Sequence, residues 1–594
     1  MNIDVNKFNV LQLAINKVHS KLTEKQFLIL ASIMVGISAG IAAVVLKMFV
    51  HFIRVFVFEN YLQFFQYKYL YLLFPVLGIG ITILIVKKFF KGNIGGGNVN
   101  ILHAIAKKGS FLPFHQMYSH IITSGITVGF GGSAGLESPI VSTGAAIGSN
   151  FSKINQLNYK ERTLLLAAGA AGGIAGAFNA PIAGILFALE VILVDISISA
   201  FIPLLIASAS GALISKILLQ ENILLYFRLQ QPFNYFNVPF YIFLGVMAGF
   251  VSLYYVNTFG KIETRFHKIK SKIFKWLLGG LSLAALISVF PSLFGEGYES
   301  IKSLAEAKPD TIFKESILAD MISNEWFVFL LITLTMLVKV FATGVTLGSG
   351  GNGGNFAPSL FVGAYLGFAF AFLLKLGGFN NIPVSNFTIV AMAGILSGVF
   401  HAPLTAIFLI AEITGGYELI IPLMIVSSIS YVIVKYFHPV SMEVKKLKEK
   451  GTIISEDKDT NILGRIDIDS VIESDFAVLH PNDKLREVIQ QIKYNKRNTL
   501  AVVGKNNKLL GLIQLDSIRE EMFNVDLYDK VTARDIMEKP SAKIDRMEDI
   551  FSVMKKFDET GQWNLPVVDD GFYLGFISKS NLLTKYRNEL LLSL

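Results

Sequence analysis

The chain has 594 residues, of which 53% are hydrophobic and 16% charged, with no cysteine and a formal net charge of +9. This length exceeds that of one ordinary domain, and the apolar share is typical of a chain that lies largely in a membrane. The absence of cysteine excludes disulfides and thiolate metal sites, and we expect no metal site. The positive charge lacks the clustered arginine face of a nucleic-acid module, so we expect no nucleic-acid partner.

The composition changes near residue 440, which divides the chain into an apolar part and a tail of ordinary soluble composition. The start of the chain lacks a signal-peptide pattern, and lysines precede the first apolar run and follow the last one. Under the positive-inside rule both termini are expected in the cytoplasm. We expect a multi-pass protein of the inner or plasma membrane, in contact with lipid, with a lead-in (1–25), a transmembrane domain (26–440), a linker (441–464) and two small domains (465–526 and 527–594).

The apolar part consists of separate runs. A membrane-spanning helix needs roughly 20 apolar residues, and several runs are shorter than this or are interrupted by glycine and proline. Such a pattern is typical of broken helices that meet around a buried site. In chain order the runs are 27–58, 69–90, 121–128, 140–151, 164–193, 200–219, 240–256, 276–294, 327–347, 356–374, 388–413 and 419–437.

One glycine-rich break carries a charge. Residues 131–139 read GGSAGLESP between apolar segments and place Glu137 where lipid makes an ionised group expensive. Glycine allows the backbone to turn, and Pro139 suits the first turn of a new helix. A helix that begins at membrane depth presents free N–H groups and a positive dipole end. The stretch therefore predicts an anion site, with Glu137 as an anion that belongs to the chain itself.

The apolar part also repeats itself. Residues 175–190 (AGAFNAPIAGILFALE) resemble residues 397–412 (SGVFHAPLTAIFLIAE) at an offset of 222 (412 − 190). Pro139 after its glycines matches Pro358 at an offset of 219 (358 − 139). Two related halves with broken helices favour a substrate site at the interface between the repeats.

Other residues of the apolar part have structural interpretations. Residues 167–173 read AAGAAGG, and small residues at this density let helices touch backbone to backbone. Glu190 and Glu412 end the two repeated segments, and we interpret them as structural acids near helix ends. His401 is a lone histidine among apolar residues, and we interpret it as a packing residue.

These features together resemble the CLC family of chloride channels and proton-coupled chloride transporters, over nearly the whole chain. Residues 135–139 (GLESP) match the family's Gly-Arg-Glu-Gly-Pro element, and residues 354–358 (GNFAP) match its Gly-x-Phe-x-Pro element. Residues 177–181 (AFNAP) and 291–298 (PSLFGEGY) also fit the family pattern. The resemblance implies a multi-spanning α-helical membrane protein made of two repeated halves with broken helices, which is not an enzyme.

The resemblance further implies a homodimer with one anion path per subunit, which carries chloride or another small anion and requires no cofactor. Glu137 resembles the family's gating glutamate, whose carboxylate occupies the anion site until it is protonated. Helix N-termini bind anions through backbone amides, and binding of moderate strength lets an ion leave again. The anion-binding residues that the resemblance implies are Gly96, Gly97, Asn98, Leu136, Glu137, Asn355, Phe356 and Ala357.

Three positions depart from the family pattern. The family's Gly-Ser-Gly-Ile-Pro element corresponds to residues 95–99 (GGGNV), so Gly96 offers no hydroxyl to an anion. Its second proton-pathway glutamate corresponds to Val191, which carries no proton. Its pore tyrosine corresponds to Met442 or Glu443, which would open the inner gate. These departures favour a glutamate-gated, pH-dependent passive chloride channel, with a proton-coupled chloride antiporter as the alternative.

The tail contains a second repeat. Residues 498–513 carry the segments NTLAVV and GLI, and residues 563–577 carry the matching segments WNLPVV and GFI. Each copy is predicted to fold as helix, strand, turn, strand and helix. The copies resemble a tandem pair of α/β CBS domains, a module that often binds adenine nucleotides through an acid on the ribose. The corresponding positions are Ser517 and Asn581, neither of them an acid, which argues against nucleotide control and leaves a dimerising scaffold equally open.

Two further classes of function stay open on the sequence. A cation channel or transporter with regulatory CBS domains would need several acids along its path, whereas the apolar part has few. An intramembrane enzyme would need a nucleophile beside a base or a cluster of metal ligands, and the apolar part shows no such cluster. Replacing Glu137 by glutamine separates anion from cation transport, because it should abolish pH gating of an anion flux and leave a cation flux unchanged.

Overall fold

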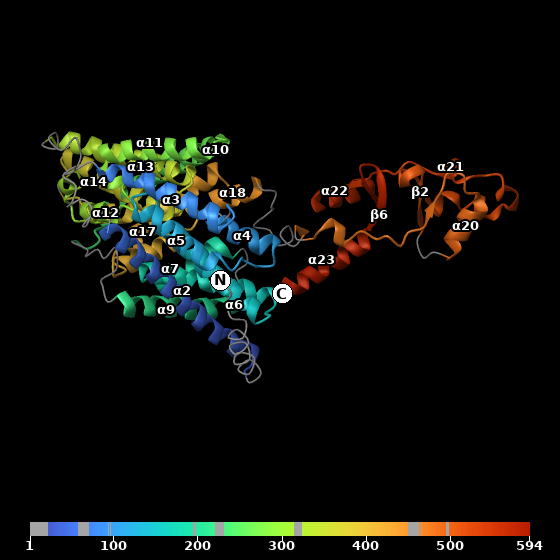
Figure 1. Ribbon diagram of the computed structural model, residues 1–594, viewed down its shortest axis with the longest axis horizontal. Coiled ribbons are helices and arrows are strands. Elements are labelled where there is room, and N and C mark those ends of the chain that lie inside the picture. The colour runs from blue at the N-terminus through green and yellow to red at the C-terminus, as the bar shows by residue number, and fades with distance from the viewer. Residues whose placement is uncertain are drawn as a thin grey trace. The chain divides into compact units, whose positions relative to one another are not determined.

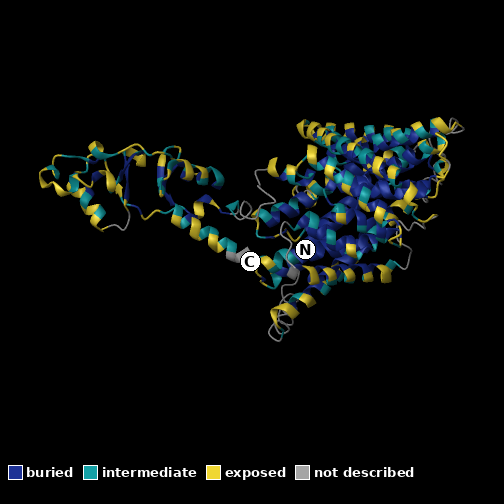
Figure 2. Ribbon diagram, turned by 180° about the vertical axis from the view of Figure 1, so that it is seen from behind, coloured by how far each residue is buried: buried dark blue, intermediate teal, exposed yellow. Residues whose placement is uncertain are grey.

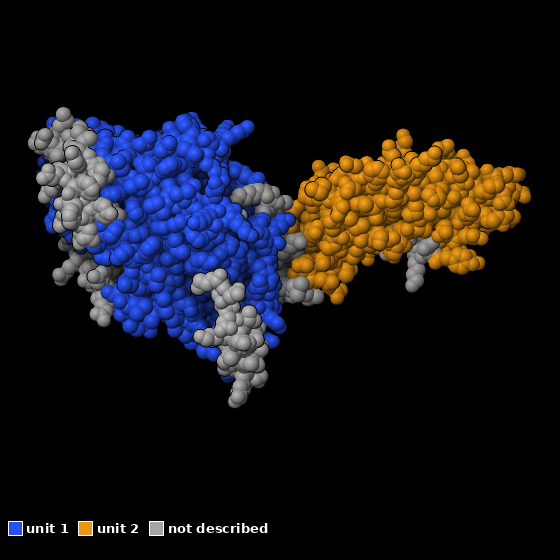
Figure 3. All heavy atoms as spheres, in the orientation of Figure 1, with its two compact units in different colours: residues 1–450 blue, residues 451–594 orange. Residues whose placement is uncertain are grey.

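The computed structural model of the chain divides into two compact units, residues 1–450 and residues 451–594 (Figure 3). The predicted lead-in and linker fall largely outside the described residues, and Gly96 falls outside them as well. The structure describes residues 22–56, 70–92, 94–95, 97–193, 198–219, 231–313, 324–379, 381–449, 463–464, 466–494 and 498–593.

The first unit is a bundle of helices (Figure 1). Among its described residues, 8 helices are long and apolar enough to cross a membrane. In Figure 2 the interior of this unit is buried and exposed stretches lie along its outer helices. Exposed apolar side chains include Phe52 and Leu84, as expected where lipid replaces water. The α-helices of the first unit, short ones included, are α2 (Glu24–Val55), α3 (Phe74–Phe89), α4 (Gly97–Lys107), α5 (Gln116–Gly129), α6 (Glu137–Ile154), α7 (Tyr159–Phe178), α8 (Pro181–Phe187), α9 (Ile198–Leu219), α10 (Val238–Lys268), α11 (Lys272–Val289), α12 (Tyr298–Ala305), α13 (Glu325–Gly348), α14 (Phe356–Leu376), α15 (Val384–Phe400), α16 (Pro403–Ile413), α17 (Ile420–Phe437) and α18 (Met442–Glu449).

Local polar signals set the starts of two of these helices. α2 begins after Thr23, whose hydroxyl accepts the Gln26 N–H while the Gln26 side chain accepts the Thr23 N–H. α7 begins after Asn158 through the same exchange with Glu161. These capping boxes satisfy N–H groups that have no partner inside the helix.

Small residues let helices of the first half pack at backbone distance. A Cβ atom added at Gly144 of α6 would lie 2.1 Å from the carbonyl oxygen of Gly169 in α7. One added at Gly172 of α7 would lie 3.0 Å from the Cα atom of Gly36 in α2. Interiors are close-packed, so no larger residue fits at the first contact. The predicted close packing of residues 167–173 is confirmed.

Each half contains one long apolar run that breaks at a left-handed residue. Asn179 ends α7 with φ 54° and ψ 39°, and His401 ends α15 with φ 57° and ψ 36°. A proline then begins the next helix in each half, Pro181 in α8 and Pro403 in α16, where its missing N–H is not needed. The two runs are therefore each two helices, and His401 is a helix cap as well as a packing residue against Tyr431.

The second unit consists of two similar copies. In each copy a short first strand runs parallel to the second strand, which pairs antiparallel with the third. Both hairpins shift register at corresponding points, between Val502 and Val503 and between Val567 and Val568. The predicted order of helix, strand, turn and strand is confirmed in both copies. The predicted closing helix is present in the second copy as α23, whereas in the first copy only short 3-10 turns follow β3, so the prediction is wrong there. The elements are β1 (Val478–Leu479), α20 (Leu485–Tyr494), β2 (Thr499–Val503), β3 (Leu509–Gln514), α21 (Ala533–Ile536), β4 (Ile544–Asp545), α22 (Ile550–Thr560), β5 (Asn564–Asp569), β6 (Phe572–Ser578) and α23 (Lys579–Ser593).

Candidate functional site

The glycine breaks of the two halves meet in the interior of the first unit. Gly135 and Gly354, which the repeat offset of 219 equates, form an isolated antiparallel bridge. The Gly135 N–H donates to the Gly354 carbonyl at 2.9 Å, and the Gly354 N–H donates to the Gly135 carbonyl at 2.8 Å. Because equivalent residues exchange equivalent bonds, the halves are related here by an approximate two-fold axis. The bridge sets the N-termini of α6 and α14 side by side.

Two threonines repeat this exchange beside the bridge. The Thr346 hydroxyl accepts the Ser133 N–H at 3.2 Å, and the Thr127 hydroxyl accepts the Asn352 N–H at 3.0 Å. The same offset equates Thr127 with Thr346 and Ser133 with Asn352. Each half therefore holds the break of the other half through a buried hydroxyl.

One long side chain in each half also reaches the break of the other half, and here the halves differ. His120 of α5 places Nδ1 at 3.3 Å from Nδ2 of Asn352, whereas Lys339 of α13 donates from Nζ to Oγ of Ser133 at 2.9 Å. The offset of 219 equates His120 with Lys339. Both side chains are buried, so one half holds its partner with an imidazole and the other with an ammonium group.

The Lys339 ammonium group makes three hydrogen bonds in this buried position. Besides Ser133, it donates to the carbonyl oxygens of Gly295 at 3.1 Å and Glu296 at 3.3 Å. Its Nζ lies 4.7 Å from the centre of the Phe361 ring, close enough for a cation–π contact. Burial of a charge is costly unless it is compensated, and Lys339 makes three hydrogen bonds and lies within electrostatic range of Glu296.

Glu137 begins α6, and its carboxylate faces the N-terminus of α14. The Ala357 N–H donates to Oε2 at 3.3 Å, and the Tyr298 hydroxyl donates to Oε1. The Glu137 residue is only 3% exposed. A helix N-terminus binds anions through such backbone donors, and here the bound anion is the chain's own carboxylate. The structure thus brings together two of the predicted site residues, Glu137 and Ala357.

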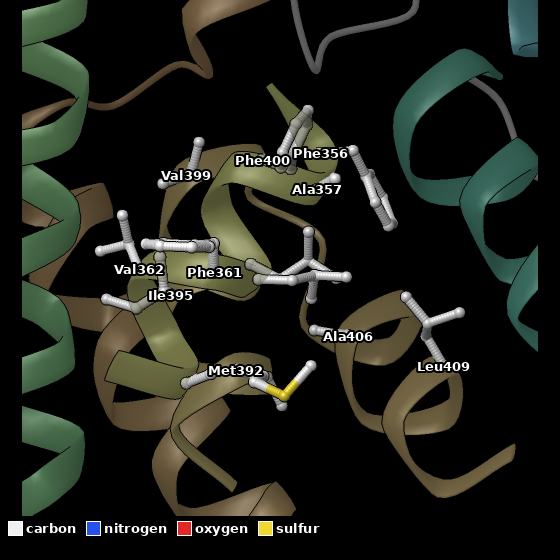
Figure 4. Packing of buried hydrophobic residues seen from close by; sticks show 14 of the residues in the cluster. Phe356, Ala357, Phe361, Val362, Met392, Ile395, Val399, Phe400, Ala406 and Leu409 are labelled. Atoms are coloured by element: carbon white, nitrogen blue, oxygen red, sulfur yellow. The ribbon is translucent and has the colours of Figure 1, made fainter. Parts of the chain in front are cut away.

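The next predicted residues occupy the positions directly before the two facing helices. Leu136 precedes α6 and Asn355 precedes α14, and neither caps its helix through a side chain. The Phe356 ring packs between Phe178 and Phe400 with centroid separations of 5.6 and 5.5 Å, and Figure 4 shows Phe356 beside Phe400. The second helix terminus therefore carries an apolar ring at the position where the first carries a carboxylate.

A buried carboxyl group lies at the predicted inner gate. Met442 and Glu443 begin α18, which packs against α4, and each is 7% exposed. Glu443 lies within electrostatic range of Tyr255, whose hydroxyl is 3.3 Å from Oδ1 of Asn355. Among the described residues, Oε2 of Glu443 has no hydrogen-bond partner.

Gly97, in the glycine-rich element at residues 95–99, lies close to the N-terminus of α6. Gly97 begins α4, and a Cβ atom on it would lie 2.7 Å from Oγ of Ser138. Asn98 is buried, and its Oδ1 has no hydrogen-bond partner within the described parts of the chain. Gly97 therefore lies beside the residue that follows Glu137.

Glu190 and Glu412 each cap a helix of the opposite half. Val191, the residue after Glu190, is a partly buried apolar residue packed against the core. Each carboxylate accepts hydrogen bonds from two backbone N–H groups at the start of a helix that begins at an Ala-Pro pair. Its negative charge also interacts favourably with the positive end of the helix dipole. The structural interpretation of both acids is confirmed. The donors are Leu404 and Thr405 for Glu190, at 3.0 and 2.7 Å, and Ile182 and Ala183 for Glu412, at 2.9 Å each.

The two predicted ribose positions lie in the second unit. Ser517 is exposed and lies in the short helical turn Asp516–Ile518 that follows β3. The Asn581 side chain donates from Nδ2 to the Val471 carbonyl at 3.1 Å, and its backbone N–H donates to the Ser578 hydroxyl at 3.1 Å. The Asn581 side chain therefore links the second small domain to a residue near the start of the first.

The sequence interpretation missed four polar residues around Glu137. Lys339 and Tyr298 contact the break and the carboxylate as described, and Glu296 lies two residues before Tyr298. Lys47 of α2 donates to the Ala177 carbonyl and lies within electrostatic range of Glu137 and Glu296. A lone ionisable residue in a membrane span is a signal of function, and Lys339 carries it in an otherwise apolar run, whereas Lys47 shares its run with His51 and Arg54.

The fold and the site define a class of membrane protein: a multi-span helical transporter whose two related halves aim helix N-termini at a buried carboxylate. The family model described as "Voltage gated chloride channel" matches residues 78–435, and the CBS domain model matches residues 467–524 and 533–588. The chain therefore belongs to the voltage gated chloride channel family, the CLC family, and carries a CBS pair. It is a CLC-type anion transport protein of the membrane, and members of this family are transporters or channels rather than enzymes.

Named relatives include both kinds of transport protein. The chain is 29% identical over 314 residues to the H(+)/Cl(-) exchange transporter ClcA of Vibrio cholerae, an alignment that covers 50% of this chain and 62% of that one. It is 28% identical over 321 residues to the voltage-gated ClC-type chloride channel ClcB of Escherichia coli, covering 53% of this chain and 72% of that one. Among solved structures, a slow cyanobacterial Cl-/H+ antiporter superposes with a TM-score of 0.60 and 21% identity, over 72% of this chain and 98% of that one, which supports the fold.

Proposed function

We propose that the protein conducts chloride or another small anion along a path that the Glu137 carboxylate gates. The observation that carries this proposal is the hydrogen bond from the Ala357 N–H to Oε2 of Glu137 at 3.3 Å. The N-terminus of α14 already holds an anion, and that anion is attached to α6. A free anion and the carboxylate therefore compete for the same backbone donor.

Protonation of Glu137 decides this competition. A neutral carboxyl group is a weak partner for a backbone N–H compared with a carboxylate, so it leaves the α14 terminus and a free anion takes its place. Deprotonation returns the carboxylate and closes the path. Backbone donors bind the anion without a full positive charge, which keeps its affinity low enough for release.

Passive conduction is the form of transport that the remaining residues support best. Val191 stands where the family's second proton-pathway glutamate would be, and its side chain packs in the core and carries no proton. Met442 and Glu443 stand where the pore tyrosine would be. Without that ring, the inner end of the path lacks its usual closure.

Proton-coupled exchange is the second candidate. The names of the Vibrio cholerae relative and of the cyanobacterial structure both describe chloride and proton antiport. In either form of transport we propose a homodimer with one path per subunit, with both termini in the cytoplasm and no required cofactor. The CBS pair then serves as a dimerising scaffold, because Ser517 and Asn581 present no acid to a nucleotide ribose.

Flux from liposomes that contain the purified protein tests this proposal. A chloride gradient is imposed, and chloride efflux and internal pH are recorded together. Chloride movement without proton pumping identifies a channel, whereas uphill proton movement identifies an exchanger. Absence of anion flux at every pH contradicts the proposal, and a potassium flux in its place identifies a cation pathway.

The Glu137→Gln variant isolates the gate. It places a neutral group of the same size at the α14 terminus, so chloride flux should become independent of pH and remain at the level that the native protein reaches in acid. Glu418→Gln is the matched control, because Glu418 is an exposed acid of the same unit. A Glu137→Gln variant that keeps the native pH profile contradicts gating by this residue.

A further inference from the structure

We propose that Glu296 is a second proton-carrying carboxyl group, which works as a pair with Glu137 and passes protons between the gate and water. This inference rests on the proposed function, because it assumes that Glu137 gates an anion path. It assigns a route for protons in a chain whose usual second proton position is Val191.

The chain segments of Glu137 and Glu296 lie against each other. Tyr298, two residues after Glu296, donates its hydroxyl to the Glu137 carboxylate. The Glu296 carboxyl group lies within electrostatic range of Glu137 and close to the backbone of Leu136, the residue before Glu137. These contacts place the two carboxyl groups in one site.

The segment that carries Glu296 is fixed by its backbone. The Gly295 N–H donates to the Gly131 carbonyl at 3.2 Å, which ties the segment to the glycine break before Glu137. Lys339 of α13 holds the same segment by donating hydrogen bonds to the Gly295 and Glu296 carbonyls. A fixed backbone keeps the Glu296 carboxyl group beside the gate instead of leaving its position to a flexible loop.

Glu296 is surrounded by groups of both charge types. The titratable groups that face it are Glu137 of α6, Lys47 of α2, Lys339 of α13 and Tyr298 of α12. Two lysines and two carboxyl groups therefore lie within electrostatic range of one another. Like charges in one buried site resist simultaneous ionisation, so a proton that reaches one carboxyl group is readily shared with the other.

The two carboxyl groups differ in their access to the surface. Residue Glu137 is buried, whereas residue Glu296 as a whole is partly exposed and lies nearer the surface. In this proposal a proton from water reaches Glu296 first. The O–H bond of the Glu296 carboxyl group then breaks as an O–H bond forms on Glu137, Glu296 becomes a carboxylate, and water protonates it again.

The test is Glu296→Gln in the full-length protein, reconstituted in liposomes. Removal of a neighbouring acid makes Glu137 easier to ionise, so we expect the pH midpoint of chloride flux to move toward acid by about one unit. Proton movement, where the native protein shows it, should fall by about tenfold or more. Chloride flux at the most acid pH should stay at the native level, because the path itself is unchanged.

Two further variants separate this role from a structural one. Glu296→Asp keeps a carboxyl group and should restore part of the native pH profile, which a loss of folding would not allow. Glu299→Gln is the matched control, since Glu299 is an exposed acid on the same segment that pairs with Arg54. A Glu296→Gln profile that matches the native one overturns the inference and leaves gating by Glu137 intact. Native chloride flux that ignores pH overturns both, and absence of anion flux overturns the proposed function itself.

Discussion

The two halves of the membrane unit share one hydrogen-bond framework and carry different charges on it. Gly135 and Gly354 exchange backbone bonds, and the threonines of both halves hold the opposite breaks in the same way. At the helix termini that this framework aligns, the first half carries Glu137 and the second carries Phe356. The shared hydrogen bonds position the two helix termini, and the difference between Glu137 and Phe356 places an ionisable group at only one of them.

A second difference runs in the opposite direction. The first half reaches across with His120, and the second reaches across with Lys339. As a result the ionisable groups collect on one side of the approximate axis, where Lys339 and Lys47 face Glu137 and Glu296. The matching positions on the other side hold an imidazole and a phenyl ring. A symmetric scaffold thus supports one gate instead of two.

The largest effect should come from breaking the shared framework at its centre. In Gly354→Ala the new Cβ would lie 2.5 Å from Cβ of Ser138 and force the two helix termini apart. Such overpacking costs about 1–3 kcal/mol, and chloride flux should fall by about tenfold or more because each 1.4 kcal/mol in the site is worth a factor of ten. Liposome flux and the thermal unfolding midpoint in detergent measure both consequences.

Gly416→Ala is the matched control for this substitution. A Cβ atom at Gly416 meets no other atom within 4 Å, so flux and stability should equal those of the native protein. Native flux in Gly354→Ala would show that the bridge between the two breaks tolerates a wider separation than the structure indicates.

Several of these structural features were predictable from the sequence. The glycines and proline around Glu137 signal a helix start at membrane depth, and the same local pattern before Pro358 identifies the second terminus. The multi-span fold, the two halves and the CBS pair followed from apolar runs and repeats. These features are local or periodic, so a chain segment displays them by itself.

The contacts between the halves were not predictable in the same way. Lys339 and Ser133 are 206 positions apart, and Tyr298 and Glu137 are 161 positions apart. Which atoms meet at such separations depends on the packing of the whole unit. The break at Asn179 was missed for a different reason, because one left-handed residue before an Ala-Pro pair hardly disturbs the apolar character of the run.

The next effect should come from removing the charge that distinguishes the second half. Lys339→Met leaves the Ser133 hydroxyl and the Gly295 and Glu296 carbonyls without their donor. Leaving buried acceptors without their donor costs about 1–3 kcal/mol, so the unfolding midpoint in detergent should drop. His120→Met removes an uncharged contact and should cost less, about 0.5–1.5 kcal/mol.

Lys375→Met is the control for this pair of variants, because Lys375 is an exposed lysine at the end of α14. It should leave the unfolding midpoint unchanged. Equal losses in Lys339→Met and His120→Met would contradict the asymmetry, since they would mean that the ammonium group and the imidazole make contributions of the same size.

The smallest effect should come from the feature that is most nearly equal in the two halves. Glu190→Ala and Glu412→Ala each remove a carboxylate that accepts two N–H groups at the start of a helix in the opposite half. Loss of such a cap costs about 0.5–2 kcal/mol. Glu190 also accepts the Thr405 hydroxyl at 2.7 Å, so its loss should be slightly the larger of the two in thermal unfolding. Glu418→Ala, at an exposed acid, should change nothing. A large difference between the two cap variants would mean that the approximate two-fold relation ends at the central bridge and does not extend to α8 and α16.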